Sequence, residues 1–289
     1  QNTYNELKND SIDSMIKKEA DRVLKQHEKK EKSAAYKTGV IIAGLLLIPI
    51  LITFIVCLSN GGGLNTFAVV TASMLLVAAM TVVPLMAQQK KLTKCIICGV
   101  FALLLIFFFV DRMYSSNEFM LWSIPTIFGL SIVLFPFVIR GIELPPALSD
   151  KKALITMLWD TLWLFLTIIE VCGHTNDVAG MKAGCIIAFV FVLAAWLIFF
   201  DARYLNANGF IKSAIIVLIA SVWTAFADDI CEFLIFGTRQ ITIKSVNFSD
   251  WTSNICVNAN VYAIVLVSGV IIASILFVAG GIKAFANKK

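Results

Sequence analysis

Eight apolar segments, each about 20 residues long, are the feature that most constrains how this chain can fold. Of the 289 residues, 59% are hydrophobic and 15% are charged, whereas an ordinary soluble domain is about 45–50% apolar and about 25% charged. A soluble globule of this length could not bury so much apolar surface. The composition therefore excludes a soluble enzyme, a disordered chain and a disulfide-rich secreted module. The apolar segments lie near residues 39–59, 65–87, 95–111, 119–140, 153–172, 179–200, 209–228 and 260–282.

Each segment is long enough to cross a hydrocarbon layer about 30 Å thick. A lone strand cannot satisfy its backbone groups in lipid, and the alternating pattern of a membrane barrel is absent from the sequence. Most connections are short, which makes neighbouring helices antiparallel. We therefore predict an all-α integral membrane protein. Its eight transmembrane helices would form a bundle of antiparallel hairpins, preceded by an N-terminal cytosolic amphipathic helix.

The distribution of basic residues predicts the orientation. If the N-terminus is cytoplasmic, 20 of the 24 Lys and Arg residues fall on the cytoplasmic side. Such an excess is what the positive-inside rule requires. We therefore expect both termini in the cytoplasm. We also expect a bacterial cell membrane as the location of the protein. The basic residues left outside are Arg112, Lys182, Arg239 and Lys244.

Three regions follow from this topology: a cytosolic stalk (1–38), a polytopic membrane domain (39–283) and a basic cytosolic tail (284–289). Within the stalk, residues 12–24 have apolar positions at the spacing of an amphipathic helix. Two interpretations stay open for this helix. It is either a juxtamembrane helix that has no protein partner, or the docking site for a partner protein or for a further N-terminal domain.

One outer connection is much longer than the others. Residues 229–259 separate the last two spans, beginning with the apolar stretch ICEFLIFG and continuing with QITIKSV in strand-like alternation. Long ordered loops in compact proteins are usually functional. We expect a structured outer cap or a re-entrant piece here.

Asp160 is the acidic residue that lies inside a span, between Trp159 and Trp163. A carboxylate at that depth costs about 2.5–3.5 kcal/mol on insertion scales. The spans contain no lysine or arginine near their centres that could pair with it. We therefore expect Asp160 to face other helices and to be protonated. It is either a proton or cation site, or a carboxyl group hydrogen-bonded to a neighbouring hydroxyl.

Four further carboxylates are predicted at the outer ends of two spans. Three or four oxygen ligands meeting at one outer mouth could hold a cation such as Ca²⁺. A solvated helix end is the other interpretation, and nothing in the sequence matches a calcium loop. The four residues are Glu170, Asp228, Asp229 and Glu232.

Two cysteines lie in the long outer segment. In an oxidising exterior, Cys231 and Cys256 could close a loop of about 25 residues, a crosslink that contributes roughly 3 kcal/mol. The alternative is that both stay free thiols. We identify no catalytic residues, no metal site and no cofactor site, and the basic residues flank spans rather than form a nucleic-acid surface.

The charged stretch SIDSMIKKEADRVLKQHEKKEKS (11–33), followed by closely spaced spans, resembles a group of uncharacterised bacterial membrane proteins. In that group a small cytosolic regulatory domain, such as a zinc ribbon or helix-turn-helix, precedes a polytopic region. The resemblance covers layout alone, so it implies no functional residue, although it would explain why the chain starts at Gln1 rather than Met.

We accordingly expect a non-enzymatic regulatory, sensory or accessory membrane protein. The alternative is a secondary transporter, coupled to protons or cations through Asp160.

Overall fold

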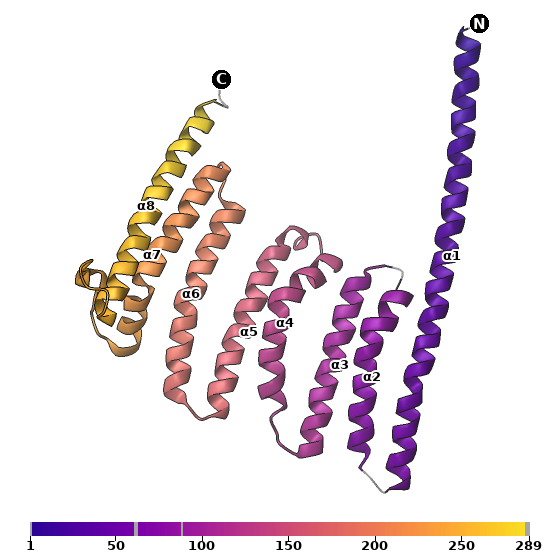
Figure 1. Ribbon diagram of the computed structural model, residues 1–289, viewed down its shortest axis with the longest axis horizontal. Coiled ribbons are helices and arrows are strands. Elements are labelled where there is room, and N and C mark those ends of the chain that lie inside the picture. The colour runs from indigo at the N-terminus through magenta and orange to yellow at the C-terminus, as the bar shows by residue number, and fades with distance from the viewer. Residues whose placement is uncertain (1, 61–62, 88, 287–289) are drawn as a thin grey trace. The chain divides into compact units, whose positions relative to one another are not determined.

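The computed structural model describes residues 2–60, 63–87 and 89–286, and every regular element in these ranges is helical (Figure 1). The all-α prediction is confirmed for this part of the chain. In chain order the elements are α1 (Asn2–Ser59), α2 (Leu64–Met86), α3 (Lys91–Tyr114), α4 (Phe119–Gly141), η1 (Ser149–Lys151), α5 (Lys152–His174), α6 (Val178–Tyr204), α7 (Gly209–Phe236), η2 (Thr242–Ser245) and α8 (Asn254–Ala286). The η elements are short 3₁₀ helices.

Within the described ranges, eight helices are long and apolar enough to cross a membrane, which confirms the predicted number of candidate spans. Large apolar side chains remain on the outside of these helices: Ile41, Phe101 and Phe189 are each more than half exposed. The buried apolar residues are mostly small, as Ala72 and Ala214 illustrate. Contiguous apolar surface of this kind is unfavourable in water, whereas lipid-facing helices present it routinely.

The chain divides into two compact units, Gln1–Thr156 and Met157–Lys289, and the division falls inside α5. In the first unit, α2 packs against α1 and α3, and α3 packs against α4. Glycines make two of these contacts close. A Cβ atom at Gly39 would lie 2.9 Å from Cγ of Met86, and one at Gly141 would collide with the Thr93 side chain.

In the second unit, α7 packs against α6 and α8. Small residues again allow the close approach, since Gly269 of α8 lies directly against Ser221 of α7. Asn208 links α7 and α8 nearer the start of α7. Its Oδ1 accepts a hydrogen bond from Ile211 N (3.0 Å), which caps α7, while its Nδ2 donates to Gly280 O (2.8 Å) on α8.

α1 is one continuous helix from Asn2 to Ser59 (Figure 1). The structure therefore does not end a separate short helix at residue 24 or mark the predicted boundary at residue 38. Lys, Glu, Gln and Ala favour helix, so the charged stretch between stalk and span gives no reason for a break. The predicted apolar face of 12–24 falls mainly on side chains outside the described residues, but Val23 and Leu24 are exposed.

The predicted outer segment is shorter than expected. Residues 229–236 continue α7, which ends where Gly237 adopts a left-handed conformation (φ 74°) that glycine tolerates without strain. The strand-like interpretation of QITIKSV is wrong, because residues Thr242–Ser245 form the 3₁₀ helix η2. We call residues 237–253, which lie between α7 and α8, the cap segment.

Candidate functional site

A hollow of about 310 Å³ lies between α6, α7 and α8. Its walls are mainly apolar, and Asp228 of α7 is the charged residue among those that line it. Tyr262 of α8 lines the same hollow as Asp228. A carboxylate and a phenol in an apolar hollow can bind a proton or a small cationic group. The lining residues are Ile187, Phe191, Thr224, Ala227, Asp228, Cys231 and Tyr262.

Asp229, the next residue of α7, contacts a different neighbour, Thr242. Its buried carboxylate accepts hydrogen bonds from Thr242 N to both oxygens (3.1 Å each) and from the Thr242 hydroxyl (2.5 Å). Adjacent helical residues are about 100° apart around the axis, so Asp228 and Asp229 cannot face the same partner. Asp229 therefore anchors the start of η2 to α7.

Asn260 of α8 anchors the other half of the cap segment and is fully buried. Its Oδ1 accepts from Asn247 N (2.8 Å), and its Nδ2 donates to Asn247 O (2.8 Å) and to Asp250 O (3.0 Å). One amide side chain thus satisfies three backbone groups of an irregular segment, which would otherwise be left unpaired in a buried position. The cap segment is held on α7 by Asp229 and on α8 by Asn260.

Asp250 orders the last turn of the cap segment before α8. Its Oδ1 accepts hydrogen bonds from Thr252 N (2.9 Å), the Thr252 hydroxyl (2.8 Å) and Ser253 N (3.2 Å). These donors favour the ionised carboxylate, the Thr252 backbone N–H most of all, and they lower the pKa of Asp250 from 3.8 to about 2.

The lowered pKa of Asp250 predicts the pH range in which the cap segment loses stability. A depressed pKa stabilises the folded segment above the unfolded value of 3.8, and this contribution is lost as pH falls from 3.8 through about 2. Pepsin should therefore cleave the cap segment slowly at pH 4 and faster at pH 2. In Asp250→Asn the rate should change much less between these pH values after correction for the pepsin activity itself. A wild-type rate that follows the Asn variant at both pH values would contradict this assignment.

Asp160 is half-buried in α5 and takes part in a polar or electrostatic interaction. The adjacent Thr161 hydroxyl accepts a hydrogen bond from Trp196 Nε1 of α6 (3.1 Å), so this part of α5 faces α6. Trp159 and Trp163 share a helix face, with ring centroids 5.6 Å apart. Asp160 does not line the hollow beside Asp228.

The four carboxylates of the predicted acidic mouth have different surroundings, and a shared cation site stays a prediction. Glu170 and Glu232 are half-buried, Asp228 is exposed toward the hollow, and Asp229 is bound to Thr242. Over the described ranges, no three His, Cys, Asp or Glu residues gather closely enough to hold a metal ion. Asp228 and Asp229 thus have different neighbours: Asp228 lines the hollow, and Asp229 binds Thr242.

The two outer cysteines are free thiols in this structure. Cys231 is buried beside Val190 and Ala227, whereas Cys256 lies in the first turn of α8 and is half-buried. The two cysteines therefore have different surroundings here, and the Cys231–Cys256 disulfide stays a prediction.

Sequence reasoning missed three polar residues of this unit. Hydropathy places Asn260 and Tyr262 among the first residues of a span. The signal that could have singled out Asn260 is its polar amide within the apolar helix α8. Asp201 of α6 is also buried, and neither of its carboxylate oxygens has a hydrogen-bond partner among the described residues. The partners of Asn260 depend on tertiary packing, which no local pattern in the sequence shows.

Comparison with known proteins identifies no relative: no family model, curated protein or solved structure matches this chain.

Proposed function

We propose that this chain is an integral protein of a bacterial cell membrane, with both termini in the cytoplasm. We further propose that it is a regulatory, sensory or accessory protein rather than an enzyme. The observation that carries the proposal is the continuity of α1, which joins the charged stalk to the first candidate span without a break.

The length of α1 supports a relay between cytosol and membrane. Its 58 residues correspond to about 87 Å at about 1.5 Å per residue, while a span needs only about 20 residues. More than half of the helix therefore extends beyond the bilayer. A partner that docks on the exposed Val23 and Leu24 would be coupled rigidly to the membrane helices.

The helix ends support the proposed orientation. Basic residues occur where α3 begins and α4 ends, where α5 begins and α6 ends, and where α7 begins and α8 ends, all on the side assigned to the cytoplasm. Two of these lysines also cap helices. Lys152 Nζ donates to Ile142 O (2.9 Å) after α4, and Lys212 Nζ donates to Ala202 O (3.0 Å) in the last turn of α6.

Single cysteines in a cysteine-free background would test the topology. We expect Gly62→Cys to react with a membrane-impermeant maleimide added outside intact cells, and Gln89→Cys to react only after the membrane is permeabilised. The two positions lie in successive connections, so each is the control for the other. Labelling of Gln89→Cys from outside would overturn the proposed orientation.

The regulatory role is tested at the stalk in the full chain. A photoreactive amino acid at Leu24 should crosslink to a cytosolic protein in cells. The same label at Lys29, on the side of α1 away from both Val23 and Leu24, should not. Purification of the crosslinked pair identifies the partner. Equal crosslinking at both positions, or crosslinking to lipid alone, would contradict a specific docking face.

A secondary transporter coupled to protons or cations is the second candidate function. The hollow that contains Asp228 and Tyr262 favours it, and Asp160 is the carboxylate inside a span. In proteoliposomes with an imposed pH gradient, this candidate predicts proton flux that Asp228→Asn or Asp160→Asn abolishes without loss of folded protein. Flux that is unchanged in both variants would exclude it.

A further inference from the structure

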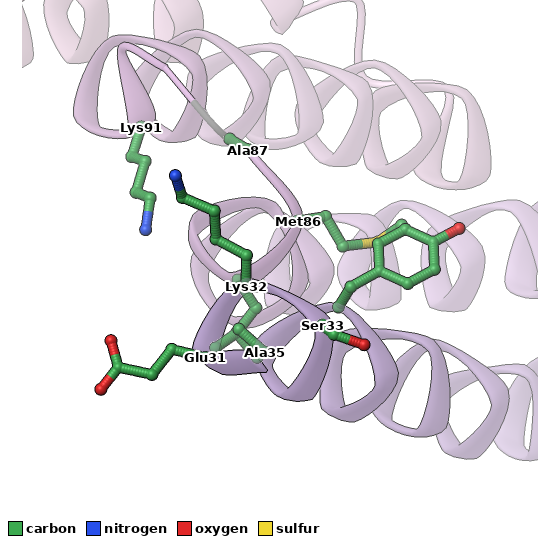
Figure 2. Close-up of a pocket in the computed structure, with 9 residues that line it drawn as sticks. Glu31, Lys32, Ser33, Ala35, Met86, Ala87 and Lys91 are labelled. Carbon is green, nitrogen blue, oxygen red and sulfur yellow. The ribbon is translucent and has the colours of Figure 1, made fainter. Parts of the chain in front are cut away.

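A second hollow lies in the first unit, where α1 passes the end of α2 and the start of α3 (Figure 2). Its volume is about 530 Å³, within the range of small-molecule sites. Residues from all three helices and from the α2–α3 connection line it. They are Glu31, Lys32, Ser33, Ala35, Tyr36, Leu85, Met86, Ala87 and Lys91.

The polar part of this hollow is basic. Lys32 of α1 and Lys91 of α3 both line it, and they come from separate helices. The Glu31 carboxylate points away from both amines in Figure 2 and lies 3.6 Å from His27 Nδ1. Two ammonium groups from separate helices therefore line the hollow.

The first turn of α3 adds backbone donors at the same place. Lys90 is its N-cap residue and makes no side-chain capping hydrogen bond, and the first turn contains no acidic residue. The N–H groups of an uncapped first turn, together with the positive end of the helix dipole, attract anions. The nearby Glu143 does not compete for them, since Lys90 Nζ binds its carboxylate (2.7 Å) and lowers the pKa of Glu143 below its ordinary 4.5.

The position of the hollow along the membrane normal indicates which ligand it binds. α2 ends at Met86 and α3 begins at Lys91, so the hollow lies where two candidate spans leave the hydrocarbon layer. Phospholipid headgroups occupy that level. Tyr36, Leu85 and Met86 supply an apolar wall for the glycerol and upper acyl region, while the lysines face the phosphate.

We propose that this hollow binds the phosphate of an anionic phospholipid headgroup. Lys32 and Lys91 contact the phosphate oxygens, and the first N–H groups of α3 complete the site. The proposal rests on the membrane insertion proposed above, but it does not depend on which side the N-terminus occupies.

The test uses the full chain purified in a mild non-ionic detergent. Native mass spectrometry would count bound lipids during titration with phosphatidylglycerol, with phosphatidylcholine, and with inorganic phosphate alone. The variants are Lys32→Gln and Lys91→Gln. Lys94→Gln is the matched control, because it removes the same charge one turn further along α3 and does not line the hollow.

Phosphatidylglycerol should bind more tightly than phosphatidylcholine, and each site variant should weaken its binding about fivefold, the value of one lysine near an anionic surface. Lys94→Gln should leave it unchanged. Equal loss in Lys91→Gln and Lys94→Gln, no preference for phosphatidylglycerol, or binding of inorganic phosphate without lipid would each overturn the proposal. A chain that stays in solution without detergent would instead contradict membrane insertion, so the two failures are distinguishable.

Discussion

Gly269→Ala is expected to lower the free energy of unfolding by about 2 kcal/mol, because overpacking a close contact typically costs about 1–3 kcal/mol. The added methyl group would occupy the same space as Cβ and Oγ of Ser221 on α7. Oγ can rotate about the Cα–Cβ bond, but Cβ is fixed to the backbone and cannot move away without shifting the helix. The usual gain from replacing a helical glycine by alanine, about 1 kcal/mol, is too small to compensate for a shift of the whole α7–α8 pair.

Gly281→Ala is the matched control for this prediction. Gly281 lies in the same helix, but a Cβ atom there would have no neighbour within 4 Å. Thermal unfolding in detergent should therefore move in opposite directions, with Gly281→Ala at or above the wild-type midpoint and Gly269→Ala below it. Ser221→Gly should rescue Gly269→Ala by removing the colliding atoms. Equal midpoints for the two alanine variants would show that α7 and α8 are not packed this closely.

This contact illustrates which parts of the fold the sequence could predict. Hydropathy alone identified all eight candidate spans, because a span must be apolar over about 20 residues wherever its neighbours lie. Ser221 and Gly269 are far apart in sequence, and glycine is common in membrane helices. Their contact depends on how α7 and α8 face each other, which no local pattern encodes.

The end of α7 illustrates a different limit. Two adjacent carboxylates at Asp228 and Asp229 predicted the end of a span, since buried charges are costly. The helix continues to Phe236, since Asp228 is exposed and the buried carboxylate of Asp229 accepts hydrogen bonds from Thr242. Thr242 comes from a later part of the chain, so no local pattern could indicate the surroundings of Asp229.

Asn260→Leu is expected to release the cap segment from α8. The substitution keeps a side chain of similar size but removes the acceptor for Asn247 N and the donor to the carbonyls of Asn247 and Asp250. Leaving a buried polar group unpaired costs about 1–3 kcal/mol. For three groups that remain partly accessible to water after relaxation, we expect a total near 3 kcal/mol, at the low end of this range for each group.

Local opening of the cap segment provides the measurement. Arg239 and Lys244 lie within it and are exposed, so trypsin can report how often the segment opens. A loss of about 3 kcal/mol corresponds to roughly a hundredfold more open segment, and cleavage at these two residues should rise accordingly. Asn258→Leu is the control, because Asn258 lies in the same helix but is exposed.

Asn260→Asp sharpens the same prediction. The carboxylate would keep an acceptor for Asn247 N but would face the Asn247 and Asp250 carbonyl oxygens without a hydrogen to donate while it is ionised. Cleavage should therefore be fast at neutral pH and slower as the carboxylate is protonated, because the protonated form regains one donor. The cleavage rate of Asn260→Leu should show no such dependence on pH, because leucine does not titrate. If Asn260→Leu and Asn258→Leu are cleaved at the same rate, the amide of Asn260 does not hold the cap segment on α8.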